Sequence, residues 1–359
     1  MIEKYLDDLE ARIDPGTEDR LLAEWTDFTE GRFTGDLFCP QRPHASPPTV
    51  EWPAVRVNEA IADFDRMALQ QFCMCSASIE SGNGQLLCVR SNYGTSILPS
   101  LFDVKLFVLD DEADTLPTSW PIADVDRLRG LVEAGVPDLH QSLAGKTLEM
   151  AARFEDIRRT YPKIGKYVHH YHPDLQGPMD ICEVLWGSGL FLELVDQPDL
   201  VHGLLDLLTE TYTRFLRAWL ELAPFENGHA AHWGMQHKGH IMLRDDSAMN
   251  LSPAMFDAFI RPYDQRLLDA FGGGAVHFCG RGDHYIESMC AMRGMHAIAM
   301  SQPEYNDMET IYRHTVDRGI PLIGLQRSAA EAALAAGRDL RGRVQCWEPG
   351  GREKMGELK

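Results

Sequence analysis

The sequence predicts an α/β fold, a (β/α)8 barrel of the TIM type with an N-terminal helical extension. Short apolar segments of strand character alternate with amphipathic helices, which is typical of a parallel sheet. Four such strand–helix units fall within about the last 130 residues, which favours a closed barrel over an open sheet. No glycine-rich phosphate loop follows the first strand candidate, as an open dinucleotide-binding sheet would require.

The first part of the chain is expected to be helical. Residues 1–50 suggest one or two helices followed by a proline-rich connection, and residues 56–80 have a helical pattern. We find no internal repeat or clear linker, so the 359 residues are interpreted as one domain. Residues 1–80 would form the extension and residues 81–350 the barrel.

The middle of the chain contains the first strand candidates. Strands are expected at 86–90 and 107–109, and a long helical region at about 122–160. Residues 179–185 suggest either a strand or the start of a helix. A strong amphipathic helix is predicted for 198–222, because large apolar residues recur there at helical spacing after Pro198.

The last third gives the clearest alternation. A strand is expected at 230–235, and Ser252 with Pro253 marks the start of a helix that runs to about Phe271. The segments that follow are predicted, in order, to be a strand around 276–279, a helix at 284–293, a strand at 296–300, a helix at 307–318, a strand at 321–325, a helix at 328–336 and a strand around 343–347.

Composition narrows the class of function. With 34 basic and 54 acidic side chains, the net charge of −20 argues against binding to nucleic acid or to an anionic membrane. The N-terminus has no signal-peptide pattern and no run is long enough to span a membrane, so we expect a cytoplasmic protein. The eight scattered cysteines are then thiols or metal ligands rather than disulfides.

The segment from Gly272 to Gly280 carries the strongest candidate for a functional site. His277 and Cys279 are two residues apart in a predicted strand, so their side chains point to the same face. Cys346 lies in the last predicted strand and is the third candidate ligand. Active-site groups of a barrel lie at the carboxyl ends of its strands. One His and two Cys would suit zinc with an open fourth position, although a core histidine and two buried thiols are the plain alternative.

Other polar residues fall at predicted strand ends. Asp245 and Asp246 are candidates for general acid–base catalysis, because paired carboxylates raise each other's pKa. A solvated loop is the alternative. The remaining candidates would contact a small-molecule substrate, and these are Asn92, Tyr93, His232, Trp233, Gln236 and Gln302.

Several segments resemble the uroporphyrinogen decarboxylase superfamily. The resemblance is good over about residues 170–350 and weak before them, and it rests on the order and spacing of its motifs. These are the segment from Gly177-Pro178 to Gly187, Asp196-Gln197-Pro198-Asp199-Leu200, Arg244-Asp245-Asp246-Ser247, Leu251-Ser252-Pro253, Phe259-Ile260-Arg261-Pro262-Tyr263 and His277-Phe278-Cys279-Gly280.

The resemblance implies a barrel that is often homodimeric, and one of two chemistries. True decarboxylases of the superfamily carry an arginine-bearing N-terminal segment that is missing from this sequence, which argues against a porphyrin substrate. The other branch contains zinc-dependent methyltransferases, which move methyl groups between a corrinoid protein and a thiol. Their ligand pattern matches His277, Cys279 and Cys346 in type and order.

The sequence therefore leads to one main hypothesis and two alternatives. The main hypothesis is a methyltransferase with one zinc ion per chain. The chain has no corrinoid-binding signature, so a corrinoid would come from a separate protein; another methyl donor is equally possible. The alternatives are a cofactor-free decarboxylase or lyase acting on a non-porphyrin substrate, and a non-catalytic barrel that binds a small metabolite.

Overall fold

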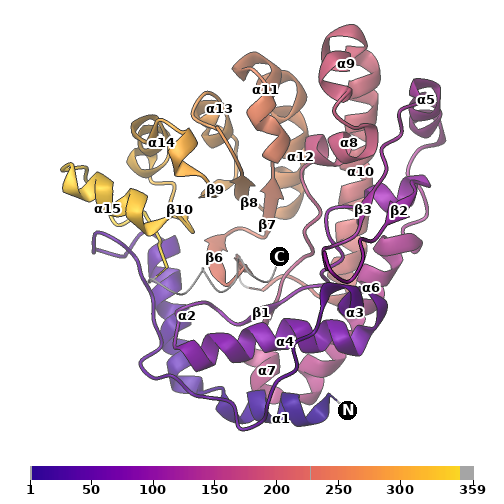
Figure 1. The fold of residues 1–359 in the computed structure, drawn as a ribbon. Coiled ribbons are helices and arrows are strands. Elements are labelled where there is room, and N and C mark those ends of the chain that lie inside the picture. Colours follow the sequence, from indigo (N-terminus) through magenta and orange to yellow (C-terminus); the bar gives the residue numbers. More distant parts are fainter. Residues whose placement is uncertain (1, 227, 348–359) are drawn as a thin grey trace.

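A computed structural model describes residues 2–226 and 228–347, which form a mixed α/β fold with parallel strands and many helices (Figure 1). The chain begins with four helices, α1 (Glu3–Arg12), α2 (Pro15–Thr29), α3 (Val57–Ala62) and α4 (Phe64–Ser81). The Asp14 side chain caps α2 and the Asp63 side chain caps α4, as the local sequence favours. The predicted helical start of the chain is confirmed.

The main sheet contains four parallel strands in the order β10-β9-β8-β7. The strands are β7 (Ile241–Arg244), β8 (Gly274–Phe278), β9 (Met295–Met300) and β10 (Leu322–Ile323). Isolated parallel bridges join Leu322 to Val344 and Phe38 to Gln345, and so extend the sheet beyond β10. The parallel sheet predicted for the last third of the sequence is confirmed.

The other strands form three pairs. The pairs are parallel β1 (Cys88–Val89) with β4 (His169–His170), antiparallel β2 (Leu106–Phe107) with β3 (Thr118–Ser119), and antiparallel β5 (His229–His232) with β6 (Met235–Lys238). Hydrogen bonds connect the segment after β4 to β7, because Gly177 N donates to Arg244 O and Met242 N donates to the His172 side chain at Nε2.

The remaining helices follow in the middle and last third of the chain. Those in the middle are α5 (Val125–Ala134), α6 (Ser142–Thr160), α7 (Pro162–Tyr167), α8 (Pro178–Trp186), α9 (Leu190–Asp196) and α10 (Pro198–Leu222). Those of the last third are α11 (Pro253–Phe259), α12 (Arg261–Phe271), α13 (Ile286–Cys290), α14 (Met308–His314) and α15 (Arg327–Ala335). The short 3-10 helices are η1 (Pro99–Phe102), η2 (Asp246–Asn250), η3 (Pro303–Tyr305) and η4 (Val316–Arg318).

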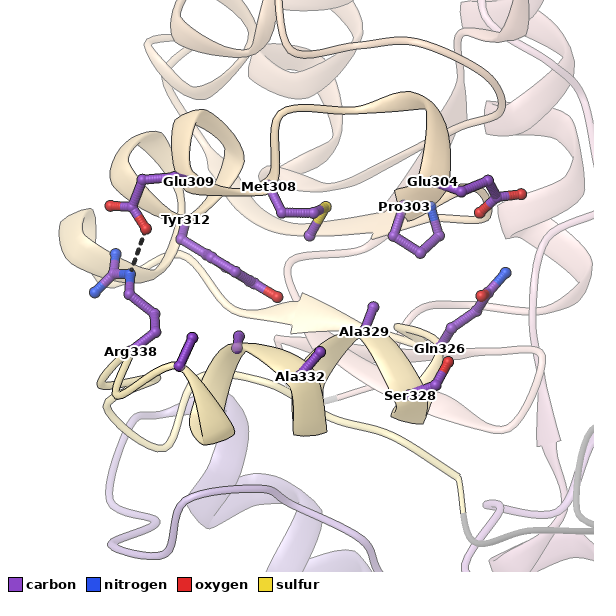
Figure 2. A pocket seen from close by; sticks show the side chains of 12 residues that line it. Pro303, Glu304, Met308, Glu309, Tyr312, Gln326, Ser328, Ala329, Ala332 and Arg338 are labelled. Carbon is purple, nitrogen blue, oxygen red and sulfur yellow. Dashed lines mark ion pairs between the residues drawn. The ribbon is translucent and has the colours of Figure 1, made fainter.

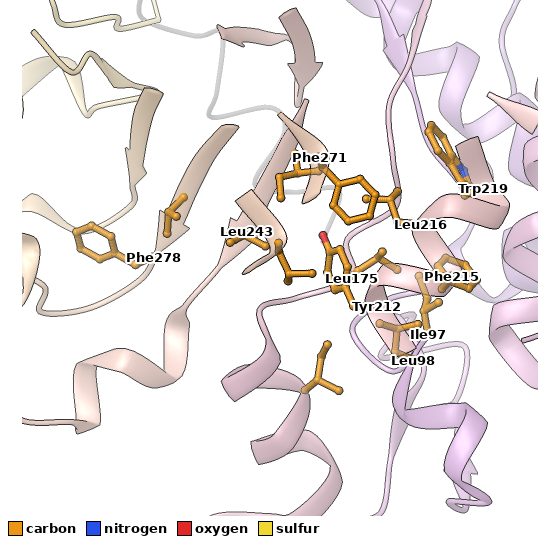
Figure 3. Packing of buried hydrophobic residues seen from close by; sticks show 14 of the residues in the cluster. Ile97, Leu98, Leu175, Tyr212, Phe215, Leu216, Trp219, Leu243, Phe271 and Phe278 are labelled. Atoms are coloured by element: carbon orange, nitrogen blue, oxygen red, sulfur yellow. The ribbon is translucent and has the colours of Figure 1, made fainter. Parts of the chain in front are cut away.

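The main sheet has two faces with different neighbours. One face of the sheet, the helix face, carries Leu243 and Phe278, which pack in the large core with α10 and the later helices (Figure 3). The opposite face, the hairpin face, carries small residues such as Ala275 and Ala299, which pack against α2 and the β5–β6 hairpin. Alternation along each strand decides which face a side chain reaches.

Residues 179–185, for which the sequence allowed either a strand or the start of a helix, form helix α8. The structure differs from the sequence prediction in three places. The single strand expected at 230–235 is the β5–β6 hairpin. The helical region at 122–160 breaks at Gly135, whose φ is +77°, and the helix after Ser252 breaks at Ile260, before Pro262. Pro262 has no backbone N–H to continue the hydrogen bonds of α11 and is well accommodated in the first turn of α12, which explains the last break.

Among the described residues, no helix has both the length and the apolar character that crossing a membrane requires.

Candidate metal centre

His277 and Cys279 meet on the hairpin face, as the sequence predicted. They share this face with Ala275, and the Cys279 Sγ lies 3.4 Å from His277 Nε2. Strand β8 can lie directly against β7 because residue 274 is glycine: an added Cβ there would come within 1.8 Å of Ile241 O. Two ligand atoms at this separation can bind one ion, since Zn–N and Zn–S bonds are about 2.0–2.3 Å long.

Asp246 supplies a third potential ligand. Among the described residues, the ligand atoms of Asp246, His277 and Cys279 form the one group of three acidic, histidine or cysteine side chains within 4.8 Å of one another. Asp246 opens η2, two residues after the end of β7, and its Oδ1 lies 4.0 Å from His277 Nε2. The same Oδ1 accepts a 2.7 Å hydrogen bond from the Cys279 backbone nitrogen.

Asp180 on α8 holds the segment that carries Asp246. Its two carboxylate oxygens accept hydrogen bonds from Asp246 N, at 2.9 Å, and from Ser247 N, at 2.8 Å. Burial, followed by the nearby Asp245 and Asp246 charges, raises the pKa of Asp180 well above its usual range. Sequence reasoning missed this residue, although Asp180 belongs to the segment that carries the family resemblance.

Ser301 and Gln302, which directly follow β9, lie next to Cys279 and the turn after it. Ser301 Oγ lies 3.6 Å from Cys279 Sγ and 3.5 Å from His277 Nε2. Gln302, predicted to contact substrate, accepts a 2.6 Å hydrogen bond from Gly280 N and so fixes the turn after Cys279. Ser301 was not predicted; its position one residue after the β9 strand is the signal that could have found it.

Cys346 lies on the other face of the sheet. Val344 pairs with Leu322, Leu322 with Ile298, and Ile298 with Val276, all of which belong to the helix-face core. Cys346 is two residues after Val344, so it shares that face and is buried in the same core. The structure therefore does not bring Cys346 to His277 and Cys279, because a shift of one residue reverses the face.

The side chains of Asp245 and Asp246 have different neighbours. Asp245 turns toward the helix face, where it is fully buried beside Asp264 of α12. Neither carboxyl group receives a hydrogen bond from an N–H or O–H group of the described chain, so a bond between them requires a shared proton. Burial and the neighbouring Asp264 raise the pKa of Asp245 well above its usual range.

The tip of the β5–β6 hairpin reaches the three potential ligands Asp246, His277 and Cys279. Trp233 and Gly234 form a two-residue turn in which both residues have positive φ, +51° and +76°. The Trp233 ring stands edge-on to the His277 ring, with centroids 5.1 Å apart, and the Arg244 guanidinium lies 4.7 Å from the Trp233 centroid. The structure thus brings Trp233, a predicted substrate contact, to the cluster.

The other predicted contacts of the hairpin, His232 and Gln236, are buried. His232 is buried, and its Nδ1 lies 2.8 Å from His237 Nε2. Burial, followed by the charge of His172, lowers the pKa of His232 well below its usual range. Gln236 is also buried and accepts hydrogen bonds from Thr26 and Thr29, which tie the hairpin to α2.

Asn92 and Tyr93 lie in the segment after β1. Tyr93 is fully buried in the helix-face core, and burial raises the pKa of its hydroxyl. Asn92 is half-buried. Neither residue belongs to the group formed by Asp246, His277 and Cys279.

The chemistry of the donor set fits a soft divalent ion. Burial, followed by the Asp246 charge, raises the pKa of the Cys279 thiol to about 11, so the thiol alone stays protonated near pH 7. A bound cation would reverse this effect, because a coordinating thiol loses its proton. Nitrogen, sulfur and oxygen ligands together suit zinc.

A separate groove of about 510 Å³ lies between α14 and α15 (Figure 2). It contains none of the three potential ligands. One end of the groove is linked to the residues around Cys279, since Gln326 lines the groove and donates a 3.1 Å hydrogen bond to Ser301 O. At the other end, Arg338 forms an ion pair with Glu309.

Comparison with known proteins shows a likeness in structure. No protein-family description matches the sequence, and no curated protein is significantly similar to it. The chain is similar in structure to a methyltransferase from Methanosarcina mazei, with a TM-score of 0.62 and 16% sequence identity, over 91% of this chain and 92% of that chain. At this identity the likeness shows the fold alone.

Proposed function

We propose that this chain is a zinc-dependent methyltransferase that activates a thiol for methyl transfer. The observation that carries the proposal is the convergence of Asp246, His277 and Cys279 at the strand ends. The methyltransferase-like fold supports it. The proposal assigns the chain to the zinc-dependent branch of the uroporphyrinogen decarboxylase superfamily rather than to the decarboxylases themselves.

Each residue would have a defined task. His277 Nε2, the Cys279 thiolate and the Asp246 carboxylate would hold the ion. A zinc ion bound there with an open fourth position would lower the pKa of an incoming thiol, so that a thiolate is present at neutral pH. Trp233 would keep water from one side of His277, and Ser301 would donate a hydrogen bond to a sulfur ligand.

The methyl donor and the assembly are further parts of the proposal. A corrinoid or another methyl donor is proposed, and a corrinoid would be carried by a separate protein, because the sequence has no corrinoid-binding signature. We also propose that the strands close into a barrel, which the backbone contacts of Gly177 with Arg244 and of Cys346 with Phe38 support. A small-molecule thiol substrate, a homodimer and a cytoplasmic location belong to the same proposal.

Zinc content tests the proposal directly. Protein purified without an affinity tag should contain about one zinc per chain by mass spectrometry. Cys279→Ala should lose the metal, whereas Cys346→Ala, a matched cysteine on the opposite face, should keep it. Wild-type protein that contains no zinc, and does not take it up on reconstitution, would overturn the proposal.

The cofactor-free decarboxylase or lyase stays as the alternative. It would use Asp245 or Asp246 with a nearby Arg or His. Asp246, whose side chain is 46% exposed, lies 4.0 Å from His277, whereas Asp245 is buried beside Asp264, so we propose Asp246 for this role. Turnover that survives removal of metal by a chelator would favour this alternative.

A further inference from the structure

Cys39 and Cys346 lie opposite each other on two paired segments from opposite ends of the chain. Phe38 and Gln345 form a parallel bridge, in which Phe38 N donates to Val344 O at 2.9 Å and Cys346 N donates to Phe38 O at 3.1 Å. One residue further along both segments, Cys39 is opposite Cys346. Residues opposite each other in paired strands present their side chains to the same face of the sheet.

The burial of these residues agrees with the register. Cys346 is a fully buried member of the large core on the helix face, and the half-buried Cys39 packs against the same core. Phe38 instead joins Trp25 on the hairpin face. Neighbouring strands lie about 4.8 Å apart, within the range of about 4.4–6.8 Å between the Cα atoms of a disulfide. The pairing therefore places two thiols at a separation that one covalent bond can span.

The backbone pairing of the two segments is short. The next hydrogen bond of a parallel ladder would run from the nitrogen of residue 40 to Cys346 O, but Pro40 has no N–H. The bridge between Phe38 and Gln345 is accordingly an isolated one. A bond between the two side chains would hold the segments together at the point where their backbones stop pairing.

The two thiols differ in their access to solvent. Cys39 lines a groove of about 540 Å³ between α2 and residues 32–41. Cys346 is fully buried on the inner side of the same pair of segments. The access of an oxidant decides which thiol reacts with it first. Cys39 is therefore placed to meet an oxidant from solution, and Cys346 is placed to react with the oxidised Cys39.

We propose that Cys39 and Cys346 are a site of reversible oxidation, at which a peroxide converts the two thiols into a disulfide. The Cys39 sulfur attacks one oxygen of hydrogen peroxide, the O–O bond breaks, one water leaves, and Cys39 becomes a sulfenic acid. The Cys346 sulfur then attacks the Cys39 sulfur, the S–O bond breaks, and the hydroxyl group leaves with the thiol proton as a second water. Two thiols and one peroxide thus give one disulfide and two waters.

The disulfide would join the N-terminal helical extension covalently to the last segment of the sheet. In a reducing compartment such a bond is transient and forms only while an oxidant is present. The site goes beyond the proposed function and does not rest on it, because neither cysteine belongs to the group of Asp246, His277 and Cys279.

Peptide mapping tests the bond directly. Reduced protein would be treated with hydrogen peroxide, its remaining thiols blocked with N-ethylmaleimide, and the product digested with trypsin under non-reducing conditions. Cleavage after Arg32 and Arg343 releases Cys39 and Cys346 in separate peptides with one cysteine each. Mass spectrometry should find these two peptides linked, and dithiothreitol should separate them. No linked peptide, or Cys39 linked as often to other cysteines, would overturn the proposal.

Single variants test the two roles. Cys346→Ala removes the second thiol, so the Cys39 sulfenic acid should persist and bind severalfold more dimedone than in the wild type. Cys73→Ala is the matched control: Cys73 is also half-buried but lies within α4, and its loss should leave the linkage unchanged. Dimedone on Cys346 rather than Cys39, or equal labelling of Cys39 with and without Cys346, would contradict the assigned roles.

Thermal unfolding tests whether the bond fastens the extension. The disulfide closes a loop that contains most of the chain, so the oxidised wild type should unfold several degrees above the reduced protein. Cys39→Ala, which changes only a half-buried side chain, should show no difference between the two conditions. A Tm that stays the same despite complete linkage would refute this part of the proposal.

Discussion

The Asp246 carboxylate accepts a 2.7 Å hydrogen bond from the backbone nitrogen of Cys279, 33 residues later in the chain. This bond joins the end of β7 to the end of β8 and sets the distance between two potential ligands. Asp180 fixes the same segment from the helix side through Asp246 N and Ser247 N. The position of the cluster therefore depends on contacts between elements as well as on the ligands themselves.

We predict that Asp246→Asn weakens zinc binding by about tenfold or more, because it replaces a charged oxygen ligand with a neutral one. Zinc affinity can be measured by competition with a chromophoric chelator. Asp245→Asn is the matched control: the adjacent residue faces Asp264 instead and should leave zinc affinity unchanged. Similar losses in the two variants would contradict the assignment.

Asp264→Asn is expected to make the protein more stable at neutral pH than the wild type. Burial raises the pKa of Asp264 to about 7, from 3.8 in the absence of such effects. The folded protein then holds a proton that the unfolded chain releases, so the wild type loses stability as pH rises from about 4 to about 7.

Asn cannot lose a proton, so the variant lacks this part of the pH dependence. Urea unfolding at pH 4.5, 6 and 7.5 should show an advantage of the variant that increases with pH. An advantage that stays constant or shrinks would mean that Asp264 is not protonated in the folded state.

At position 233, glycine should be tolerated better than alanine. Trp233 has φ of +51°, a left-handed conformation that costs a residue with a side chain about 1–2 kcal/mol relative to glycine. Trp233→Ala and Trp233→Gly both lose the contacts with His277 and Arg244, so their difference reports the backbone alone. Thermal unfolding should therefore give the higher Tm for Trp233→Gly. The opposite order would show that the turn changes conformation.

Two glycine-to-alanine substitutions should act in opposite directions. Gly274 lies where a Cβ would come within 1.8 Å of Ile241 O, so Gly274→Ala must separate β7 from β8 and should destabilise the protein severely. Gly130 lies within α5, where an added Cβ would meet no atom from outside the helix backbone within 4 Å, so Gly130→Ala should stabilise the protein by up to about 1 kcal/mol. Urea unfolding of both variants would check this; a mild effect at Gly274 would mean that the strands can adjust.

The sequence could predict features that depend on local periodicity. His277 and Cys279 share a face because strand geometry repeats every two residues, and this holds wherever the strand lies in the protein. The amphipathic helix over 198–222 and the start at Ser252-Pro253 were likewise predicted, since apolar spacing and capping act within a few residues.

Only the tertiary structure decided which distant residues join the pair. Cys346 matched the expected ligand type, but the register of β10 with Val344 turns it to the helix face, and no local pattern encodes that register. Asp245 and Asp246 looked equivalent in sequence, yet the end of β7 directs one toward Asp264 and the other toward His277. The sequence by itself determined that His277 and Cys279 lie on one face of β8. The packing of β7 against β8 and of the β5–β6 hairpin decided that Asp246 is the third potential ligand and that Trp233 lies beside it, because these contacts join segments far apart in the chain.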